Sequence, residues 1–278
     1  MNSTHRPGRL LSVAAMSVGV LVSTPAEPAD LQPHTIAAFD RYVQLSEAQA
    51  ADRADYLRLD SLPEAQQRAR RDELRAGMLL IERLTTLAGR REIPIPDGLV
   101  HHWIGTVFAP GATVNQALAL LQDYDNHAEI YRPAVVQSRL LSRDGDRFRM
   151  FLRFSMTKVI TVVVNTDNDA RFTRDGPDRA RSRIYSTRVA QVEDAGQPSE
   201  RELPVGHDGG YLWRLNTYWR FLERDGGTYV QCESISLTRG IPFGFGWMIR
   251  PFVTSIPRES LEFTLNTTRK TLSKTPPP

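Results

Sequence analysis

The last third of the chain constrains the fold more than any other stretch. Two runs rich in aromatic and β-branched residues, 211–223 and 228–239, flank Asp225-Gly226, a dipeptide typical of tight hairpin turns. Capping residues and an apolar stripe then predict a helix over 255–272. Two long paired strands followed by an amphipathic helix indicate a curved sheet around that helix, which is an architecture suited to enclosing a hydrophobic ligand.

The middle of the chain supplies further strands for the same sheet. Turn residues separate strand-like runs at 100–109, 134–142, 147–157, 159–173 and 180–193. A capping box and an apolar stripe predict one helix after the first of these runs, and a further helical turn before Pro133. The predicted fold class is α+β, with a strongly curved antiparallel sheet of about six to seven strands and a long C-terminal helix.

The region before this sheet is predicted to be helical. Apolar residues recur at helical spacing from 31 to 87, through Met78 and Ile81, and a break near Pro63 divides the region into two helices. Two prolines in EIPIPDG mark a boundary, so a helical extension, 30–92, precedes a ligand-binding domain, 98–273. The extension either packs against the sheet, which we favour, or forms a lid or partner surface. A disordered proline-rich tail is expected at 274–278.

The first residues have the pattern of an export signal. A basic start precedes the apolar run 10–22, which is shorter than the roughly 20 residues that span a bilayer. Small residues and prolines follow, and cleavage after Ala26 or Ala29 is expected, giving a signal peptide at 1–29 and a periplasmic or secreted protein. The alternative is an uncleaved N-terminal anchor.

Several classes of chemistry lack support in the sequence. The single cysteine, Cys232, cannot form an intramolecular disulfide, and a formal charge of +3 without a dense basic tract argues against nucleic-acid binding. The chain has no Gly-x-Ser-x-Gly elbow, phosphate loop or dinucleotide fingerprint. His101 and His102 are adjacent on a predicted strand, so their side chains should face opposite ways, which argues against a shared metal. We expect neither a metal nor a cofactor.

The last hairpin offers the best candidate polar site. A two-residue turn places Tyr218 opposite Glu233 and Arg220 opposite Gln231. The other face of the strand is then apolar and is expected to meet the cavity and the terminal helix. A shift of one residue would reverse the faces and place Tyr218, Arg220 and Glu233 in the cavity. Otherwise these polar residues form a ladder on the outer face.

Two other segments carry candidate functional residues. His127 and Asp123 lie in one loop and could serve as a base and its orienting group, although capping or solvent exposure is the favoured interpretation. The connection 240–257 is rich in aromatic residues and glycine, and it either packs, gates a pocket or contacts a membrane surface through residues 247–252.

The order of elements, covering residues 100–273, resembles the START-like superfamily, also called SRPBCC, with its helix-grip fold. The hairpin 219–230, W-R-F…D-G-G-T-Y-V, is similar to the last hairpin of polyketide-cyclase-like and lipid-transfer members. The motifs HHWIGTVF, LWRLNTYWRF, QCESISLTR and IPRESL look most like an uncharacterised family of exported bacterial proteins.

This resemblance implies an exported binding or transfer protein for a lipid or other hydrophobic small molecule, held between the sheet and the C-terminal helix. The candidate lining residues are Trp213, Leu215, Trp219, Phe221, Phe243, Phe245, Trp247, Leu261 and Leu265. One alternative is a cyclase or aromatase that uses His127, Tyr218, Arg220 or Glu233 in the same cavity. Another is an envelope protein-interaction module with a collapsed cavity. The oligomeric state stays open.

Overall fold

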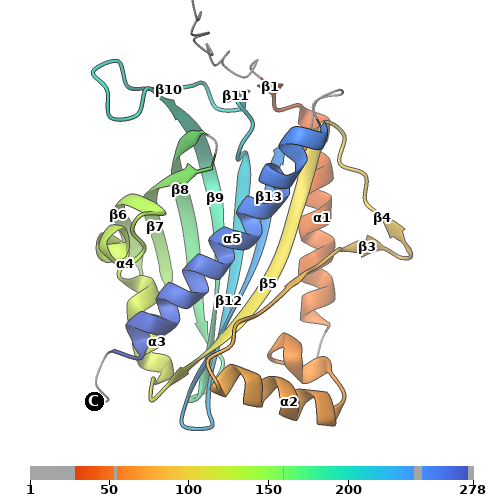
Figure 1. The fold of residues 1–278 in the computed structure, drawn as a ribbon, viewed down its shortest axis with the longest axis vertical. Helices are drawn as coiled ribbons and strands as arrows, with labels where there is room; N and C mark the ends of the chain where they lie inside the picture. The colour runs from red at the N-terminus through yellow and green to blue at the C-terminus, as the bar shows by residue number, and fades with distance from the viewer. Residues whose placement is uncertain (1–28, 53–54, 159, 241–245, 275–278) are drawn as a thin grey trace, which may run out of the picture.

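The computed structural model describes residues 29–52, 55–158, 160–240 and 246–274. Within these residues, nine strands form one antiparallel sheet in the order β2-β5-β13-β12-β9-β8-β7-β6, with β10 beside β9. The strands are β2 (Leu80–Arg83), β5 (Gly98–Pro110), β6 (Val135–Asp144), β7 (Arg147–Thr157), β8 (Thr161–Arg174), β9 (Arg179–Glu193), β10 (Arg201–Glu202), β12 (Arg214–Arg224) and β13 (Gly227–Arg239). The long helix α5 (Gly246–Leu272) lies across one face (Figure 1). The predicted α+β helix-grip architecture is confirmed.

The last hairpin has the predicted turn and register. Asp225 and Gly226 have φ angles of 58° and 75°, the left-handed values that a tight hairpin turn requires at both central positions. Tyr218 pairs with Glu233 and Arg220 with Gln231, as the two-residue turn predicts. This register fixes which side chains of β12 and β13 meet α5.

We call the face covered by α5 the inner face. Leu261 and Leu265 of α5 are buried in one core cluster with Trp219 and Phe221 of β12. The helix approaches β5 closely at Gly105, where an added Cβ would lie 2.5 Å from Leu265 Cδ1. A residue without a side chain therefore allows α5 to seat against the sheet.

The start of α5 differs from the prediction. The sequence placed the helix start near Ser255, with residues 240–257 as a connection, but the helix begins nine residues earlier, at Gly246. Pro257 was assigned to a first turn because proline is favoured there, yet it lies inside the helix. Phe243 and Phe245 fall outside the described residues, as does the side chain of Trp247.

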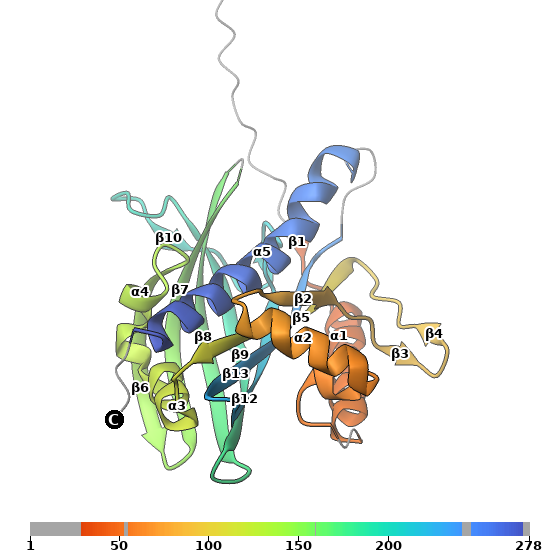
Figure 2. The same cartoon turned by 60° about the horizontal axis from the view of Figure 1, so that its bottom comes forward.

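The sheet also has more strands than predicted. Helix α2 (Glu64–Arg75) ends before Gly77, which has a φ of 91°, and the chain continues into β2 beside β5. Met78 and Ile81, which were predicted to belong to the second helix, therefore lie beyond its end, because the left-handed glycine stops it. Figure 2 shows α2 near β5, with β2 next to it. β2 and the short β10 account for the additional strands.

Apart from helix α1 (Pro33–Ala51), the remaining described elements are short. They are β1 (Ala29–Asp30), η1 (Arg58–Ser61), β3 (Leu87–Ala88), β4 (Arg91–Glu92), α3 (Val114–Gln122), η2 (Tyr124–Asn126), α4 (His127–Ile130) and β11 (His207–Asp208). Among the described residues, no helix is both long enough and apolar enough to span a membrane.

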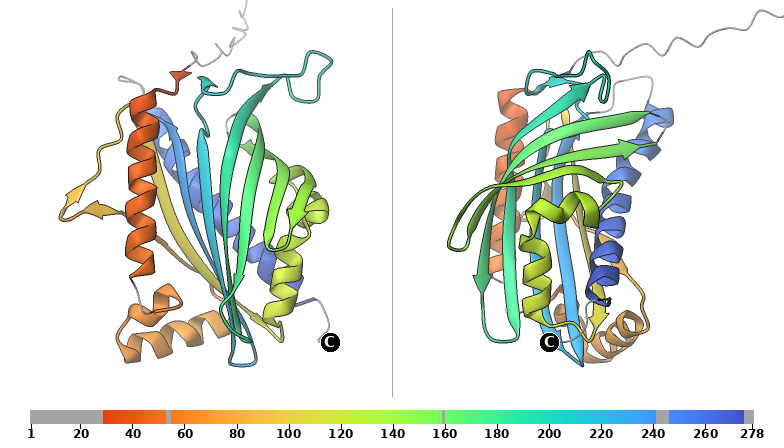
Figure 3. Two further views of the ribbon diagram at one scale, coloured as in Figure 1. Left: turned by 180° about the vertical axis from the view of Figure 1, so that it is seen from behind. Right: turned by 90° about the vertical axis from the view of Figure 1, so that its left-hand side faces the viewer.

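The N-terminal extension packs against the sheet, on the face opposite α5, which we call the outer face (Figure 3). Helix α1 (Pro33–Ala51) contributes Phe39 and Tyr42 to a buried cluster with Ile235 and Leu237 of β13. The interpretation of the extension as a packed element, favoured from the sequence, is confirmed. The sheet therefore has a helix on each face.

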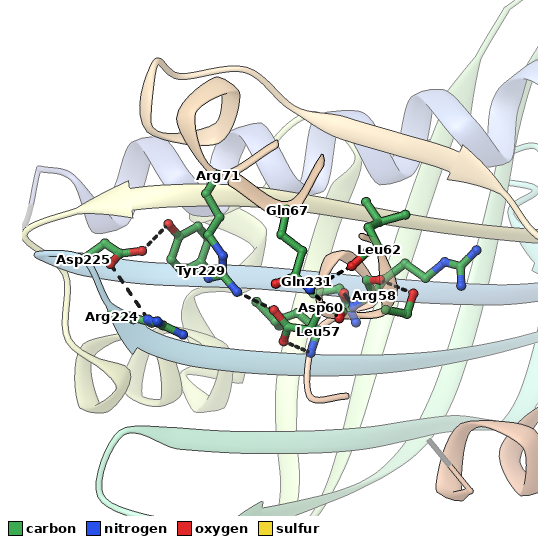
Figure 4. A network of polar contacts seen from close by, with 11 residues as sticks. Leu57, Arg58, Asp60, Leu62, Gln67, Arg71, Arg224, Asp225, Tyr229 and Gln231 are labelled. Carbon is green, nitrogen blue, oxygen red and sulfur yellow. Dashed lines mark hydrogen bonds and ion pairs between the residues drawn. The ribbon is translucent and has the colours of Figure 1, made fainter. Parts of the chain in front are cut away.

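A polar network fastens the segment after α1 to the same face (Figure 4). The Arg58 backbone N–H donates to Gln231 Oε1 at 2.7 Å. Asp60 accepts from Arg71, whose guanidinium also lies 5.4 Å from the centre of the Tyr229 ring. These contacts connect η1 and α2 to β13, and they position the outer-face side chains described below.

Candidate functional site

The inner face carries apolar side chains beyond the packed core. By strand alternation, the face that α5 covers includes a row of half-buried side chains on four strands. They are Trp103, Leu152, Phe154, Met156, Ile184 and Leu215. The core residues between them and α5 are almost completely buried. The inner face thus combines a closed core with an accessible apolar surface.

Three buried polar atoms accompany this apolar surface. Tyr124 Oη, His127 Nε2 and Ser182 Oγ have no hydrogen-bond partner within the described part of the chain. Ser182 pairs in register with Phe172 and Trp219, so its hydroxyl lies on the inner face among aromatic residues. Leaving such a group unpaired costs about 1–3 kcal/mol. These atoms are suited to bind the polar group of a bound molecule.

His127 is buried, whereas the sequence favoured capping or exposure. Its side chain is 5% exposed, and its ring centre lies 4.9 Å from that of Tyr124 and 5.1 Å from that of Tyr131. Tyr131 hydrogen-bonds Thr268 of α5 at 3.0 Å. The apolar stripe of α3 and the aromatic neighbours pull the loop into the core, which overrides the polar composition of the loop. Asp123 does have the expected turn role, because it accepts from the Asn126 amide.

The buried histidines give the protein a pH-dependent stability. Burial lowers the pKa of His127 to about 4, and burial followed by the Arg83 charge lowers the pKa of His101 to about 4. In the unfolded chain both pKa values lie near 6.5. Between pH 6.5 and pH 4 the unfolded state binds more protons, so the free energy of unfolding falls as the pH falls.

We expect His127→Gln to flatten this dependence. Denaturant unfolding measured at several pH values from 7 to 4.5 should show a slope that corresponds to about one proton fewer than in the wild type. The absolute stability at pH 7 is a separate readout and does not affect the slope. An unchanged slope would contradict the assignment of a buried, neutral His127.

A cavity of about 740 Å³ lies on the outer face, between the C-terminal end of α1 and strands β8, β9, β12 and β13. Tyr218, Arg220 and Glu233 all line it. The Tyr218 hydroxyl donates to Glu47 of α1 at 2.9 Å. Arg220 Nη1 donates to the Tyr56 carbonyl at 2.7 Å. The polar residues of the last hairpin therefore face α1 rather than α5.

Glu233 also has a buried partner behind the cavity. The Tyr42 hydroxyl accepts from the Thr86 backbone N–H at 2.8 Å and shares a hydrogen bond with His102 Nδ1 at 3.0 Å. His102 Nε2–H then donates to Glu233 Oε1 at 2.8 Å. His101 points to the other face and bonds Thr238, as the strand alternation predicted. Glu233 is thus held as a hydrogen-bond acceptor.

Tyr218 is held in its neutral form. Burial, followed by the charge of Glu47, raises the pKa of Tyr218 well above its usual value. Its hydroxyl therefore acts as a hydrogen-bond donor at neutral pH.

The fourth candidate, His127, lies on the other side of the sheet, where it is packed with Tyr124 in the inner-face core. The structure does not bring His127 together with Tyr218, Arg220 and Glu233.

The structure separates the candidate lining residues into groups. Trp219, Phe221, Leu261 and Leu265 are buried between the sheet and α5, while Leu215 is half-buried on the inner face. Trp213 lies in the outer-face cluster instead, where its indole N–H donates to Asp208 at 3.1 Å. It precedes β12, so strand alternation does not determine its direction.

Sequence reasoning missed two sets of residues. Ser182 gave no signal, because a serine in a strand is ordinary. The arginines of β9 did give one, since 179, 181 and 183 alternate with smaller or apolar residues. That pattern is typical of a strand with one polar face.

Comparisons with solved structures found distant similarities. A STAR-related lipid transfer protein from Xanthomonas axonopodis is 15% identical, with a TM-score of 0.43, over 70% of this chain and 99% of that one. The Zhui aromatase/cyclase from Streptomyces sp. R1128 is 11% identical, with a TM-score of 0.44, over 63% and 95%. Human STARD10 is 10% identical, with a TM-score of 0.43, over 76% and 81%.

No protein-family model matches the chain, and no curated protein sequence matches it either. At the similarity of these solved structures, nothing about a ligand or an activity follows for this chain. The fold assignment rests on the elements themselves, an antiparallel meander from β6 to β13 that follows β5, α3 and α4, with the terminal helix α5 across it. The chain has the helix-grip fold of START-like proteins.

Proposed function

We propose that the protein binds a lipid or another hydrophobic small molecule between the inner face of the sheet and α5. The observation that carries this proposal is the row of half-buried apolar side chains, Trp103, Leu152, Phe154, Met156, Ile184 and Leu215, on the face that α5 covers. Covering such surface with a ligand contributes roughly 25 cal/mol per Å² of apolar area.

The orientation of the ligand would come from few polar atoms. Ser182 Oγ, Tyr124 Oη and His127 Nε2 are buried without partners in the described structure, so a ligand hydroxyl or carbonyl could bond one of them. An apolar surface with a small number of polar points is typical of small-molecule sites. This role requires binding only and no covalent step.

The N-terminal sequence supports export as a further part of the proposal. Its basic start and short apolar run are typical of a signal peptide, which would place the protein in the periplasm or outside the cell. Residues 247–252 would then contact a membrane surface transiently during loading or release. Liposome flotation with a Trp247→Ala, Phe252→Ala variant tests this contact.

We expect Ile184→Trp to block ligand binding. A larger ring at this half-buried inner-face position would fill the space that a ligand needs, so titration with the fluorescent probe N-phenyl-1-naphthylamine should show at least about tenfold weaker binding. The matched control is Leu141→Trp, at a residue of β6 that is 40% exposed. Equal binding by both variants would contradict the proposed site, and absence of binding by the wild type would favour the protein-interaction alternative.

A further inference from the structure

The outer-face cavity is lined by an array of arginines that the strand register places directly opposite one another. Arg171 of β8 pairs with Arg183 of β9, and Arg181 of β9 pairs with Arg220 of β12. All four line the cavity. Like charges directly opposite each other on neighbouring strands destabilise a sheet. A bound anion would relieve this repulsion.

Two of these four arginines lack a carboxylate partner among the described residues. Arg183 stacks on the Tyr185 ring, 5.1 Å from its centre, and Arg220 bonds backbone carbonyls, including Tyr56 O at 2.7 Å. The other two have one ion pair each, Arg171 with Asp146 and Arg181 with Asp175, both at 3.3 Å. Arg183 and the free edge of Arg220 are therefore suited to bind a ligand.

Two of the four carboxylates of the cavity are hydrogen-bonded by groups other than arginine. Glu47 accepts from the hydroxyls of Tyr185 and Tyr218, and Glu233 accepts from His102 at 2.8 Å. Asp55 and Asp175 also line the cavity. The lining holds five arginines, including Arg179, against four carboxylates, which leaves one net positive charge.

The cavity also has surfaces for an organic group. Tyr56, Tyr218 and Ala50 line it beside the arginines. Its volume of about 740 Å³ lies within the range of roughly 300–1,000 Å³ that is typical of small-molecule sites. Guanidinium groups bind phosphate through paired N–H donors, and they stack on planar rings.

We propose that this cavity is a second ligand site, distinct from the inner face, and that it binds a phosphate monoester carried on a planar organic group. The phosphate lies among Arg171, Arg181, Arg183 and Arg220, and the organic group lies against Tyr56 and Tyr218. The same phosphate chemistry occurs in soluble phosphoesters and in the headgroup of phosphatidic acid.

Isothermal titration of the full chain with phenyl phosphate at low ionic strength tests the proposal. Arg183→Gln should weaken binding by about tenfold or more, because it removes a charge-assisted contact. Among the described residues Arg183 has no hydrogen bond to the N-terminal extension, unlike Arg220, so this variant should leave that packing intact. The matched control is Arg139→Gln, at an exposed arginine of β6 whose guanidinium lies 5.9 Å from the centre of the Phe151 ring.

A second variant tests the same cavity without changing charge. Ala50→Phe should reduce phenyl phosphate binding by filling the space beside α1, while it should leave N-phenyl-1-naphthylamine binding on the inner face unchanged. Sedimentation with phosphatidic acid vesicles distinguishes the sources, because binding to vesicles but not to phenyl phosphate would identify a lipid headgroup and would overturn the planar organic group. No binding to phenyl phosphate or vesicles, or equal binding by Arg183→Gln and Arg139→Gln, would overturn the proposal.

Discussion

Leu265→Ala should lower the free energy of unfolding by about 2–5 kcal/mol, which is the range for truncating a fully buried leucine. Leu265 is 0% exposed and lies between α5 and the inner face, in the cluster that includes Trp219 and Phe221. Its removal takes away apolar contact and leaves a cavity where the helix meets the sheet. Guanidinium unfolding followed by circular dichroism measures the change.

The control for this variant is the same substitution on the surface. Leu141→Ala, at a position that is 40% exposed, should change the unfolding free energy by no more than about 0.5 kcal/mol. If Leu265→Ala lowered the free energy of unfolding by as little as the control does, α5 would not pack on the sheet as described.

The second large effect is a coupling between Gly105 and Leu265. A Cβ added at Gly105 would lie 2.5 Å from Leu265 Cδ1, and Leu265 is fully buried, so its side chain cannot move aside easily. Gly105→Ala alone should therefore lower the free energy of unfolding by about 1–3 kcal/mol, which is the usual effect of inserting extra atoms into a packed core.

In the Leu265→Ala background, Gly105→Ala should lower the free energy of unfolding far less, because Leu265 Cδ1, which the added Cβ would meet at 2.5 Å, is gone. A double-mutant cycle should give a coupling energy of about 1 kcal/mol or more between the two positions. Gly176→Ala is the matched control, since its Cβ would meet the side chains of Asp178, at 3.3 Å, and Arg179, at 3.7 Å, and no atom of α5. Strict additivity of Gly105→Ala and Leu265→Ala would contradict the close approach of α5 to β5.

The sheet was predictable because its signals are local. Turn dipeptides such as Asp225-Gly226 set the hairpin register, and alternation then assigned Tyr218 and Trp219 to opposite faces. The errors arose where tertiary contact overrides local preference. β2 reads as a continuation of α2 until Gly77 takes a left-handed conformation, and α5 continues through Pro257, which the sequence placed in its first turn.

The candidate sites were only partly predictable, for a related reason. The polar and apolar faces of β12 follow from its own alternation, but the position of α1 above Tyr218 and Arg220 depends on contacts between distant segments. The arginine array likewise needs the pairing of β8, β9 and β12, which brings together residues up to about fifty positions apart in the chain. An unaligned sequence does not contain that pairing.

The two proposed sites are independent, and each has its own substitution. Ile184→Trp should affect only the inner face and Ala50→Phe only the outer cavity, because the two residues lie on opposite sides of the sheet. A variant that weakened the binding of both N-phenyl-1-naphthylamine and phenyl phosphate would indicate a loss of folding, which the unfolding measurements above would detect.

Native mass spectrometry of the full chain, purified gently from an exporting bacterium and combined with denaturing spectra and an organic extract, tests most directly whether the protein carries a hydrophobic ligand. We expect a bound apolar molecule that is released on denaturation, is lost in Ile184→Trp and is retained in Ala50→Phe. A wild-type protein that carries no such molecule, even after incubation with a lipid extract, would contradict this expectation.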